Sequence, residues 1–197
     1  MTEVLMFHHA LGLTAAVESF ADELRRAGHE VVTPDLFDGE TFGSVSDGVA
    51  HAERLGFDTI IARGVAAADR MDGPFIVAGL SLGVLPAQKL AQTSPTVHGA
   101  LLYFAAVPVS TFAARWPSGV PTELHLVEDD EWAVEDRDAA EEVATASGGR
   151  RYLYPGRGHL VTEVGSTDHD PVAATLILER SLAFLGRLDD DPRGVPP

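Results

Sequence analysis

A serine between two glycines is the first candidate for chemistry in this 197-residue chain. Ser81 lies in the run Gly79-Leu80-Ser81-Leu82-Gly83, after the apolar stretch 74–78 and before the helix-like stretch 84–91. A serine between a strand and a helix sits on a very tight turn. The residues two before and two after it can then carry almost no side chain, and both glycines meet this requirement. The context predicts a nucleophile whose hydroxyl stands above the end of a sheet; the alternative is a purely structural turn.

An acid and a histidine, which an activated serine needs, follow two later strand-like stretches. The alternating stretch 122–127 runs into Glu128-Asp129-Asp130-Glu131, and the stretch 151–154 runs into Pro155-Gly156-Arg157-Gly158-His159. Parallel strands end at one edge of a sheet, so residues far apart in sequence can meet there. The pattern therefore predicts a serine, an acid and a histidine in one site.

Through these motifs the chain resembles the dienelactone hydrolase family of the α/β-hydrolases. Their order, serine, then acid, then histidine, is the order of that superfamily. The likeness runs from Val4 to about Leu185, and three further stretches carry it: Phe7-His8-His9-Ala10-Leu11-Gly12-Leu13, Val32-Thr33-Pro34-Asp35-Leu36-Phe37 and Tyr154-Pro155-Gly156-Arg157-Gly158-His159. They are similar to the family's first strand with its oxyanion loop, its second strand and its histidine loop.

The resemblance implies a role for each candidate residue. Ser81 would be the nucleophile, Asp130 the acid and His159 the base, with the backbone N–H groups of Ala10 and Leu82 forming the oxyanion hole. Two alternatives remain for the acid: Asp129 could take its place, and either aspartate could instead cap a helix that begins near Glu131.

The chain also departs from the family pattern. The namesake enzymes use a cysteine nucleophile and a glutamate in the oxyanion loop, whereas this chain has no cysteine and carries His9 at the glutamate's place. Glu163 stands four residues after the histidine, where an arginine grips the substrate's carboxylate in those enzymes. We therefore expect a serine hydrolase that prefers neutral esters, although Arg157 could neutralise Glu163 or bind an anion itself.

A substrate pocket is expected from residues near these motifs: Leu11, Phe37, Phe112, Trp116, Arg157 and Glu163. Phe112 and Trp116 could roof an apolar acyl pocket or pack in the core. His125 and His169 are interpreted as structural or solvated. His8 and His9 are adjacent in an extended strand and point to opposite faces, so no shared metal site is predicted.

The composition limits the expected binding partners and cellular location. The net charge of −16 disfavours nucleic acid and anionic membranes, because so acidic a surface would repel them. No signal-like or bilayer-length apolar stretch appears, which makes the cytoplasm the default expectation. We expect a small-molecule ester as the substrate and no cofactor, and the sequence does not indicate an oligomeric state.

The expected fold is a three-layer, doubly wound α/β-hydrolase. Strands alternate with helices, and strands are predicted near 3–8, 30–34, 74–80, 98–105, 122–127 and 150–154. The mainly parallel sheet of about six strands would lack the family's usual first two. Residues 1–188 are expected to form a single domain, with one or two helices in 40–71 and a largely buried closing helix over 172–185. Residues 189–197 are expected to be a mobile tail.

The function that this pattern favours is hydrolysis of a small carboxylic ester through an acyl-enzyme. A thioesterase or acyltransferase shares the same intermediate and differs only in leaving group or acceptor. A binding protein on the same fold is the alternative of another class, and it is disfavoured because all three site positions carry competent residues.

Overall fold

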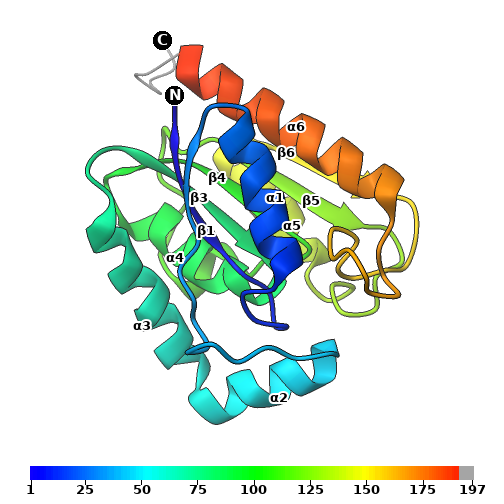
Figure 1. Ribbon diagram of the computed structural model, residues 1–197. Coiled ribbons are helices and arrows are strands. Elements are labelled where there is room, and N and C mark those ends of the chain that lie inside the picture. Colours follow the sequence, from blue (N-terminus) through cyan, green and yellow to red (C-terminus); the bar gives the residue numbers. More distant parts are fainter. Residues whose placement is uncertain (191–197) are drawn as a thin grey trace.

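A six-stranded, all-parallel sheet forms the centre of the computed structural model, which describes residues 1–190 (Figure 1). Its strands are β1 (Glu3–Phe7), β2 (Glu30–Val32), β3 (Phe75–Leu80), β4 (Val97–Tyr103), β5 (Thr122–Val127) and β6 (Arg150–Tyr154). They lie in the order β2-β1-β3-β4-β5-β6. All six predicted strands are confirmed, with ends that differ from the prediction by at most two residues.

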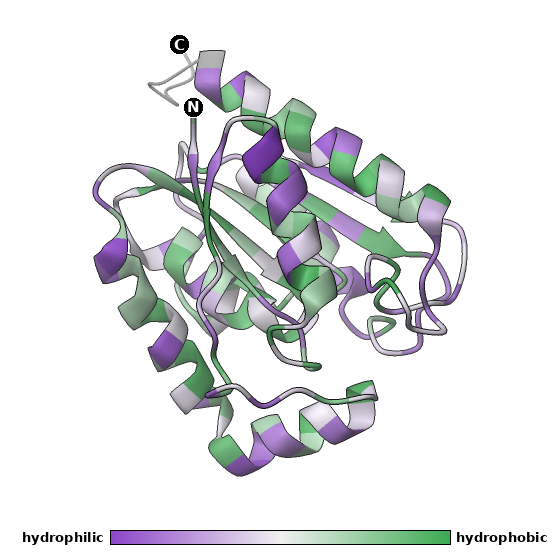
Figure 2. Ribbon diagram, viewed as in Figure 1, coloured by the Kyte–Doolittle hydropathy of each residue, from purple (hydrophilic) through white to green (hydrophobic). Residues whose placement is uncertain are grey.

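Helices cover both faces of the sheet and complete three layers. Figure 1 shows α1 (Ala15–Arg26) and α6 (Pro171–Asp190) on one face, and α3 (Phe57–Ala67), α4 (Val84–Thr93) and α5 (Arg137–Ser147) on the other. Successive strand residues supply alternate cores, as the period of a strand requires. In β1, Val4 and Met6 pack under α1 and α6, whereas Leu5 and Phe7 pack under α3 and α4. Figure 2 shows this as apolar strands between helices whose outer sides are hydrophilic.

Two α-helices occupy the region 40–71, where one or two were predicted. Helix α2 (Val45–Leu55) begins at Ser44, whose side chain accepts a hydrogen bond from the Asp47 N–H, a usual N-terminal cap. Gly56, with φ of 85°, separates α2 from α3, and a short 3-10 helix (Ala68–Arg70) follows. Figure 1 shows α2 below the carboxyl end of β1. Two further short 3-10 helices are Ser81–Gly83, between β3 and α4, and Val109–Thr111, between β4 and β5.

The closing helix differs from its prediction in two ways. It is amphipathic rather than largely buried: Ile177, Ser181 and Leu185 face the core, while Val172 is 68% exposed. The helix also continues through Asp190, two residues into the expected tail, and the Asp189 carboxylate accepts a hydrogen bond from the N-terminal ammonium. The rest of that tail, 191–197, lies outside the described residues.

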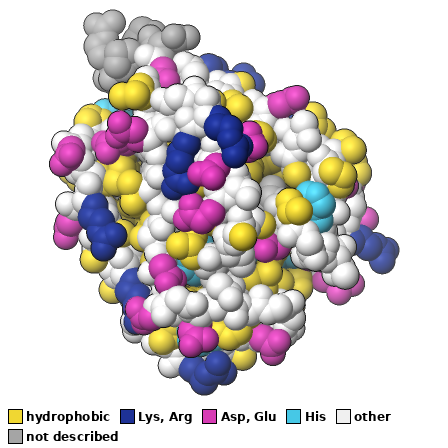
Figure 3. Space-filling model, viewed as in Figure 1, with side chains coloured by type: hydrophobic (Ala, Val, Ile, Leu, Met, Phe, Trp, Pro, Cys, Tyr) yellow, Lys and Arg dark blue, Asp and Glu magenta, His cyan; other side chains and the backbone are white. Residues whose placement is uncertain are grey.

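The charged side chains show no single-sign patch on the face in view. Figure 3 shows acidic side chains spread over it, with Lys and Arg among them. No helix in residues 1–190 is both long enough and apolar enough to cross a membrane.

Candidate active site

The glycine-flanked serine forms a strained turn between β3 and α4. Ser81 has φ of 49°, in the left-handed region that side chains other than glycine rarely adopt. A Cβ on Gly79 would collide with the backbone of Gly83, and a Cβ on Gly83 would lie 2.5 Å from the Phe7 carbonyl oxygen. Both glycines are therefore required by space, as the sequence predicted, and the turn lifts Ser81 above the sheet edge.

Three side chains from different strand ends form one hydrogen-bonded chain. The distance from Ser81 Oγ to His159 Nε2 is 2.7 Å, and the distance from His159 Nδ1 to Asp130 Oδ2 is 2.6 Å. Asp130 and His159 are buried, and Ser81 is partly exposed. With Nδ1–H donating to the carboxylate, Nε2 is free to accept the serine hydroxyl proton. The order of contacts matches the predicted serine, histidine and acid.

The structure brings Asp130, and not Asp129, to the histidine. Asp130 Oδ1 also accepts a hydrogen bond from the Trp132 N–H at 2.9 Å, which fixes the carboxylate from its other side. Asp129 is exposed, and its N–H donates to the Gly156 carbonyl. Helix α5 begins only at Arg137, so neither aspartate caps it.

A further acid, which the sequence analysis did not single out, holds the histidine loop. Asp168 Oδ2 accepts hydrogen bonds from the N–H groups of His159 (3.0 Å) and Leu160 (3.3 Å). Its carboxylate therefore fixes the backbone that carries the imidazole. No sequence pattern joins Asp168 to His159, because the contact depends on how the loop folds back.

The two predicted oxyanion-hole residues border the same cavity as the serine. The pairing of Phe7 with Gly79 places the loop after β1 beside the serine turn. Ala10 and Leu82 both line the cavity with Ser81 and His159. Gly48 of α2 packs against the Ala10 carbonyl so closely that a Cβ there would overlap it. Helix α2 thus supports the loop that carries the Ala10 N–H.

His8 and His9 contact different partners. His8 Nε2 accepts from the Leu36 N–H at 2.9 Å, and Nδ1 donates to the His9 carbonyl at 2.8 Å. Burial lowers the pKa of His8 to about 4, so its ring is neutral at pH 7. His9 Nε2 lies 2.8 Å from Glu163 Oε2. Within residues 1–190, no group of three or more His, Asp or Glu side chains is arranged to hold a metal ion.

The cavity beside Ser81 has a volume of about 340 Å³ and a mainly apolar wall. Its wall includes side chains from α2, α3, α4 and the loops after β4 and β5: Val45, Val49, Phe57, Leu85, Phe104 and Trp132. Asp136 and His159 are the ionisable side chains of this wall. Sequence reasoning missed most of these residues, because α2 and α3 carry no motif that marks them as a cover.

Four of the predicted pocket residues take other places. Leu11 and Phe37 are buried in the two hydrophobic cores. Arg157 is exposed and lies outside the cavity wall, and Glu163 is buried against His9. Arg157 and Glu163 are both in the histidine loop, and neither lines the cavity. The structure therefore shows no contact through which Glu163 would set a preference for neutral esters.

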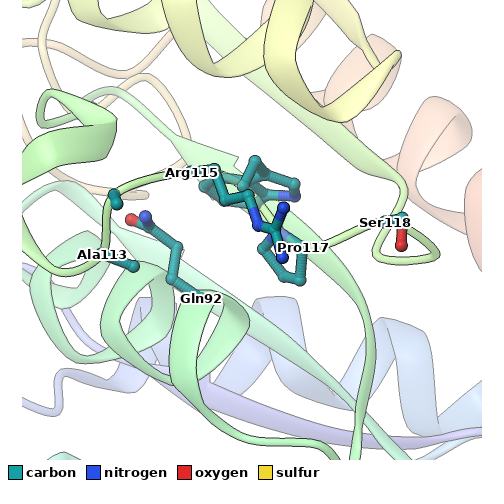
Figure 4. A pocket seen from close by; sticks show the side chains of 7 residues that line it. Gln92, Ala113, Arg115, Pro117 and Ser118 are labelled. Atoms are coloured by element: carbon teal, nitrogen blue, oxygen red, sulfur yellow. The ribbon is translucent and has the colours of Figure 1, made fainter.

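Phe112 and Trp116 line two other hollows. Phe112 borders a hollow of about 720 Å³ that shares Phe57 and Leu85 with the cavity beside Ser81. Trp116 lies beside a separate hollow with Gln92 and Arg115, which Figure 4 shows from close by. The Trp116 Nε1–H donates to the Val120 carbonyl at 2.9 Å, as a buried indole requires. Of the two, only Phe112 adjoins the site.

The parallel sheet with helices on both faces is an α/β-hydrolase fold. The chain belongs to the dienelactone hydrolase family, whose model matches residues 1–188. A dienelactone hydrolase from Anabaena variabilis is 18% identical, with a TM-score of 0.69 over 94% of this chain and 86% of that one. No curated protein matches the chain.

Two further solved structures share the fold. A dienelactone hydrolase-like promiscuous phosphotriesterase from metagenomic libraries has a TM-score of 0.74 at 16% identity, covering 95% of this chain and 87% of that one. A cold-adapted esterase from an Arctic intertidal metagenomic library has a TM-score of 0.68 at 18% identity, covering 94% and 82%. The chain is therefore a member of a hydrolase family with esterases among its structural neighbours.

Proposed function

We propose that this chain is a serine hydrolase that cleaves a small carboxylic ester through an acyl-enzyme. The observation that carries the proposal is the chain of contacts from Ser81 through His159 to Asp130 at the wall of a mainly apolar cavity. A serine hydroxyl is a weak nucleophile at neutral pH and needs such a base.

Each residue of this chain of contacts has a step to perform. His159 Nε2 takes the Ser81 proton as Oγ attacks the ester carbonyl, and Asp130 holds the ring in the required tautomer and stabilises its cation. His159 then gives the proton to the leaving alcohol. A water molecule, activated by the same nitrogen, hydrolyses the acyl-enzyme and restores Ser81.

The oxyanion of the tetrahedral intermediate would be held by the backbone N–H groups of Ala10 and Leu82. Leu82 stands at the start of the turn into α4, where the helix dipole adds positive potential. Loss of one such donor costs on the order of 3 kcal/mol in comparable sites. Burial of the site strengthens these interactions, because water competes less for the oxyanion.

A fluorophosphonate probe tests the nucleophile directly. We expect one adduct per chain on Ser81, and no adduct in Ser81→Ala. Ser110→Ala, which changes an exposed serine, is the matched control and should label fully. Hydrolysis of p-nitrophenyl acetate should fall by about a million-fold in Ser81→Ala, by analogy with removal of a serine nucleophile elsewhere. Absence of labelling would favour a binding protein on this fold. Residual activity of Ser81→Ala within tenfold of wild type would instead overturn the assignment of Ser81 as the nucleophile.

A further inference from the structure

The cavity beside Ser81 contains a carboxylate that the proposed chemistry does not use. Asp136 lines this cavity together with Ser81 and His159 and is partly buried. One carboxylate oxygen, Oδ2, accepts a hydrogen bond from the Ala106 N–H at 3.3 Å. Burial raises the pKa of Asp136, while the Ala106 N–H and the nearby His159 oppose that shift. A positive group near this carboxylate would therefore be favourable.

Aromatic rings line the same cavity. Trp132 and Phe57 line the wall although their side chains are 50% and 42% exposed, so both can meet a ligand that enters from solvent. The Trp132 ring lies 6.2 Å from the His159 ring. Large apolar side chains this exposed are informative when they border a pocket.

No lysine or arginine belongs to the wall of this cavity among residues 1–190. Arg137, the next residue after Asp136, donates instead to the backbone carbonyl of Glu128. A carboxylate with no lysine or arginine in the wall of a cavity that also holds exposed aromatic rings is a combination that binds organic cations. The ring quadrupoles attract the positive charge and the carboxylate adds a direct Coulomb attraction.

The position of these groups indicates which half of an ester they border. His159 must reach the leaving oxygen to protonate it, so side chains next to the imidazole border the alcohol part of the substrate. Trp132 lies next to the His159 ring, and Asp136 lines the same cavity as His159.

We propose that Asp136 and Trp132 select esters whose alcohol part carries a positive charge, such as the esters of amino alcohols. This inference rests on the proposed ester hydrolysis and names its substrate class.

A pair of isosteric substrates tests the charge preference. Acetylcholine and 3,3-dimethylbutyl acetate differ by one positive charge at nearly equal volume, and acid release in a pH-stat measures both. We expect wild type to prefer acetylcholine by about tenfold or more in kcat/KM, the ratio that a modest electrostatic contact supplies. In Asp136→Asn this ratio should fall at least about fivefold. Asp138→Asn, which removes an exposed charge in the first turn of α5, is the matched control and should keep the wild-type ratio.

Each other outcome is decisive. A wild-type ratio near one overturns the inference. Equal loss on both esters in Asp136→Asn, with an unchanged ratio, would mean that Asp136 acts on the His159 cation rather than on substrate, which also overturns it. Turnover of p-nitrophenyl acetate without turnover of either acetate overturns the inference and leaves the proposed function intact. If none of the three esters is hydrolysed, the proposed function itself fails.

Discussion

His9 of the loop after β1 is joined to Glu163 of the histidine loop by a buried hydrogen bond of 2.8 Å. The Leu11 N–H donates to His9 Nδ1 at 3.3 Å, so Nε2 carries the proton that Glu163 accepts. The Thr14 hydroxyl donates to the same carboxylate oxygen at 3.0 Å. The contact therefore ties the loop that carries the Ala10 N–H to the loop that carries His159.

Removing the acceptor of this contact should disturb the oxyanion loop. Glu163→Ala leaves the His9 N–H buried without a partner, which costs about 1–3 kcal/mol of stability. We expect kcat for p-nitrophenyl acetate to fall about tenfold or more, with a smaller change in KM, because the Ala10 N–H moves from its place. Glu163→Gln keeps an acceptor oxygen and should restore most of kcat. Steady-state kinetics and thermal unfolding of both variants measure these effects. Equal kcat values in Glu163→Ala and Glu163→Gln would contradict the role of Glu163 as the acceptor for His9.

Substitutions of Asp130 and of its neighbour Asp129 form a matched pair that tests which aspartate acts on His159. Asp130→Asn should keep the His159 ring near its place but favour the wrong tautomer, which lowers kcat by roughly ten-thousand-fold in serine proteases. Asp129→Asn changes an exposed side chain and should keep kcat near that of wild type. The kcat values for one activated ester decide the matter. The reverse order of effects would place the acid one residue earlier.

Alanine substitutions at two glycines should differ greatly in their effect on stability, because only one of these glycines lies in the tight serine turn. In Gly83→Ala the new Cβ would lie 2.5 Å from the Phe7 carbonyl oxygen, and backbone must move to admit it. We expect a loss of about 2 kcal/mol or more in the free energy of unfolding, with loss of activity. Gly43→Ala is the control, since a Cβ there meets nothing within 4 Å. Urea denaturation compares the two, and a Gly83→Ala variant as stable as Gly43→Ala would refute the packing argument.

Buried histidines should make the fold sensitive to acid. His125 is fully buried, its Nδ1 lies 2.8 Å from the Tyr154 hydroxyl, and burial lowers its pKa to about 3. As the pH falls, His125 is therefore protonated in the unfolded chain before it is protonated in the folded protein. The free energy of unfolding is highest above about pH 6.5 and decreases as the pH falls toward 3.

This loss should amount to about 1.4 kcal/mol per pH unit for each such histidine, and His8 adds to it above its own lowered pKa. Urea unfolding at pH 8, 6.5 and 5 measures the slope. His125→Gln should make the slope below pH 6.5 shallower, whereas His98→Gln, a partly exposed histidine of β4, should leave it as in wild type. A slope unchanged in His125→Gln would contradict this account.

The sequence alone was enough to predict the six strands and the residues of the serine turn. A strand shows a period of two, and a turn that admits no Cβ must carry Gly79 and Gly83, so these features depend on neighbours in the chain. The same holds for the placement of Ser81, an aspartate and His159 at strand ends, because parallel strands share one carboxyl edge.

Only the tertiary structure decided which side chains surround the serine. Trp132, Phe57 and Asp136 reach the cavity because of how α2, α3 and the loop after β5 pack over the sheet edge. Phe37 and Trp116, which the sequence analysis expected in the pocket, are buried elsewhere. Glu163 likewise pairs with His9, 154 residues away, rather than facing substrate. Contacts between loops distant in sequence leave no local period or spacing, because they arise from the packing of whole elements against one another.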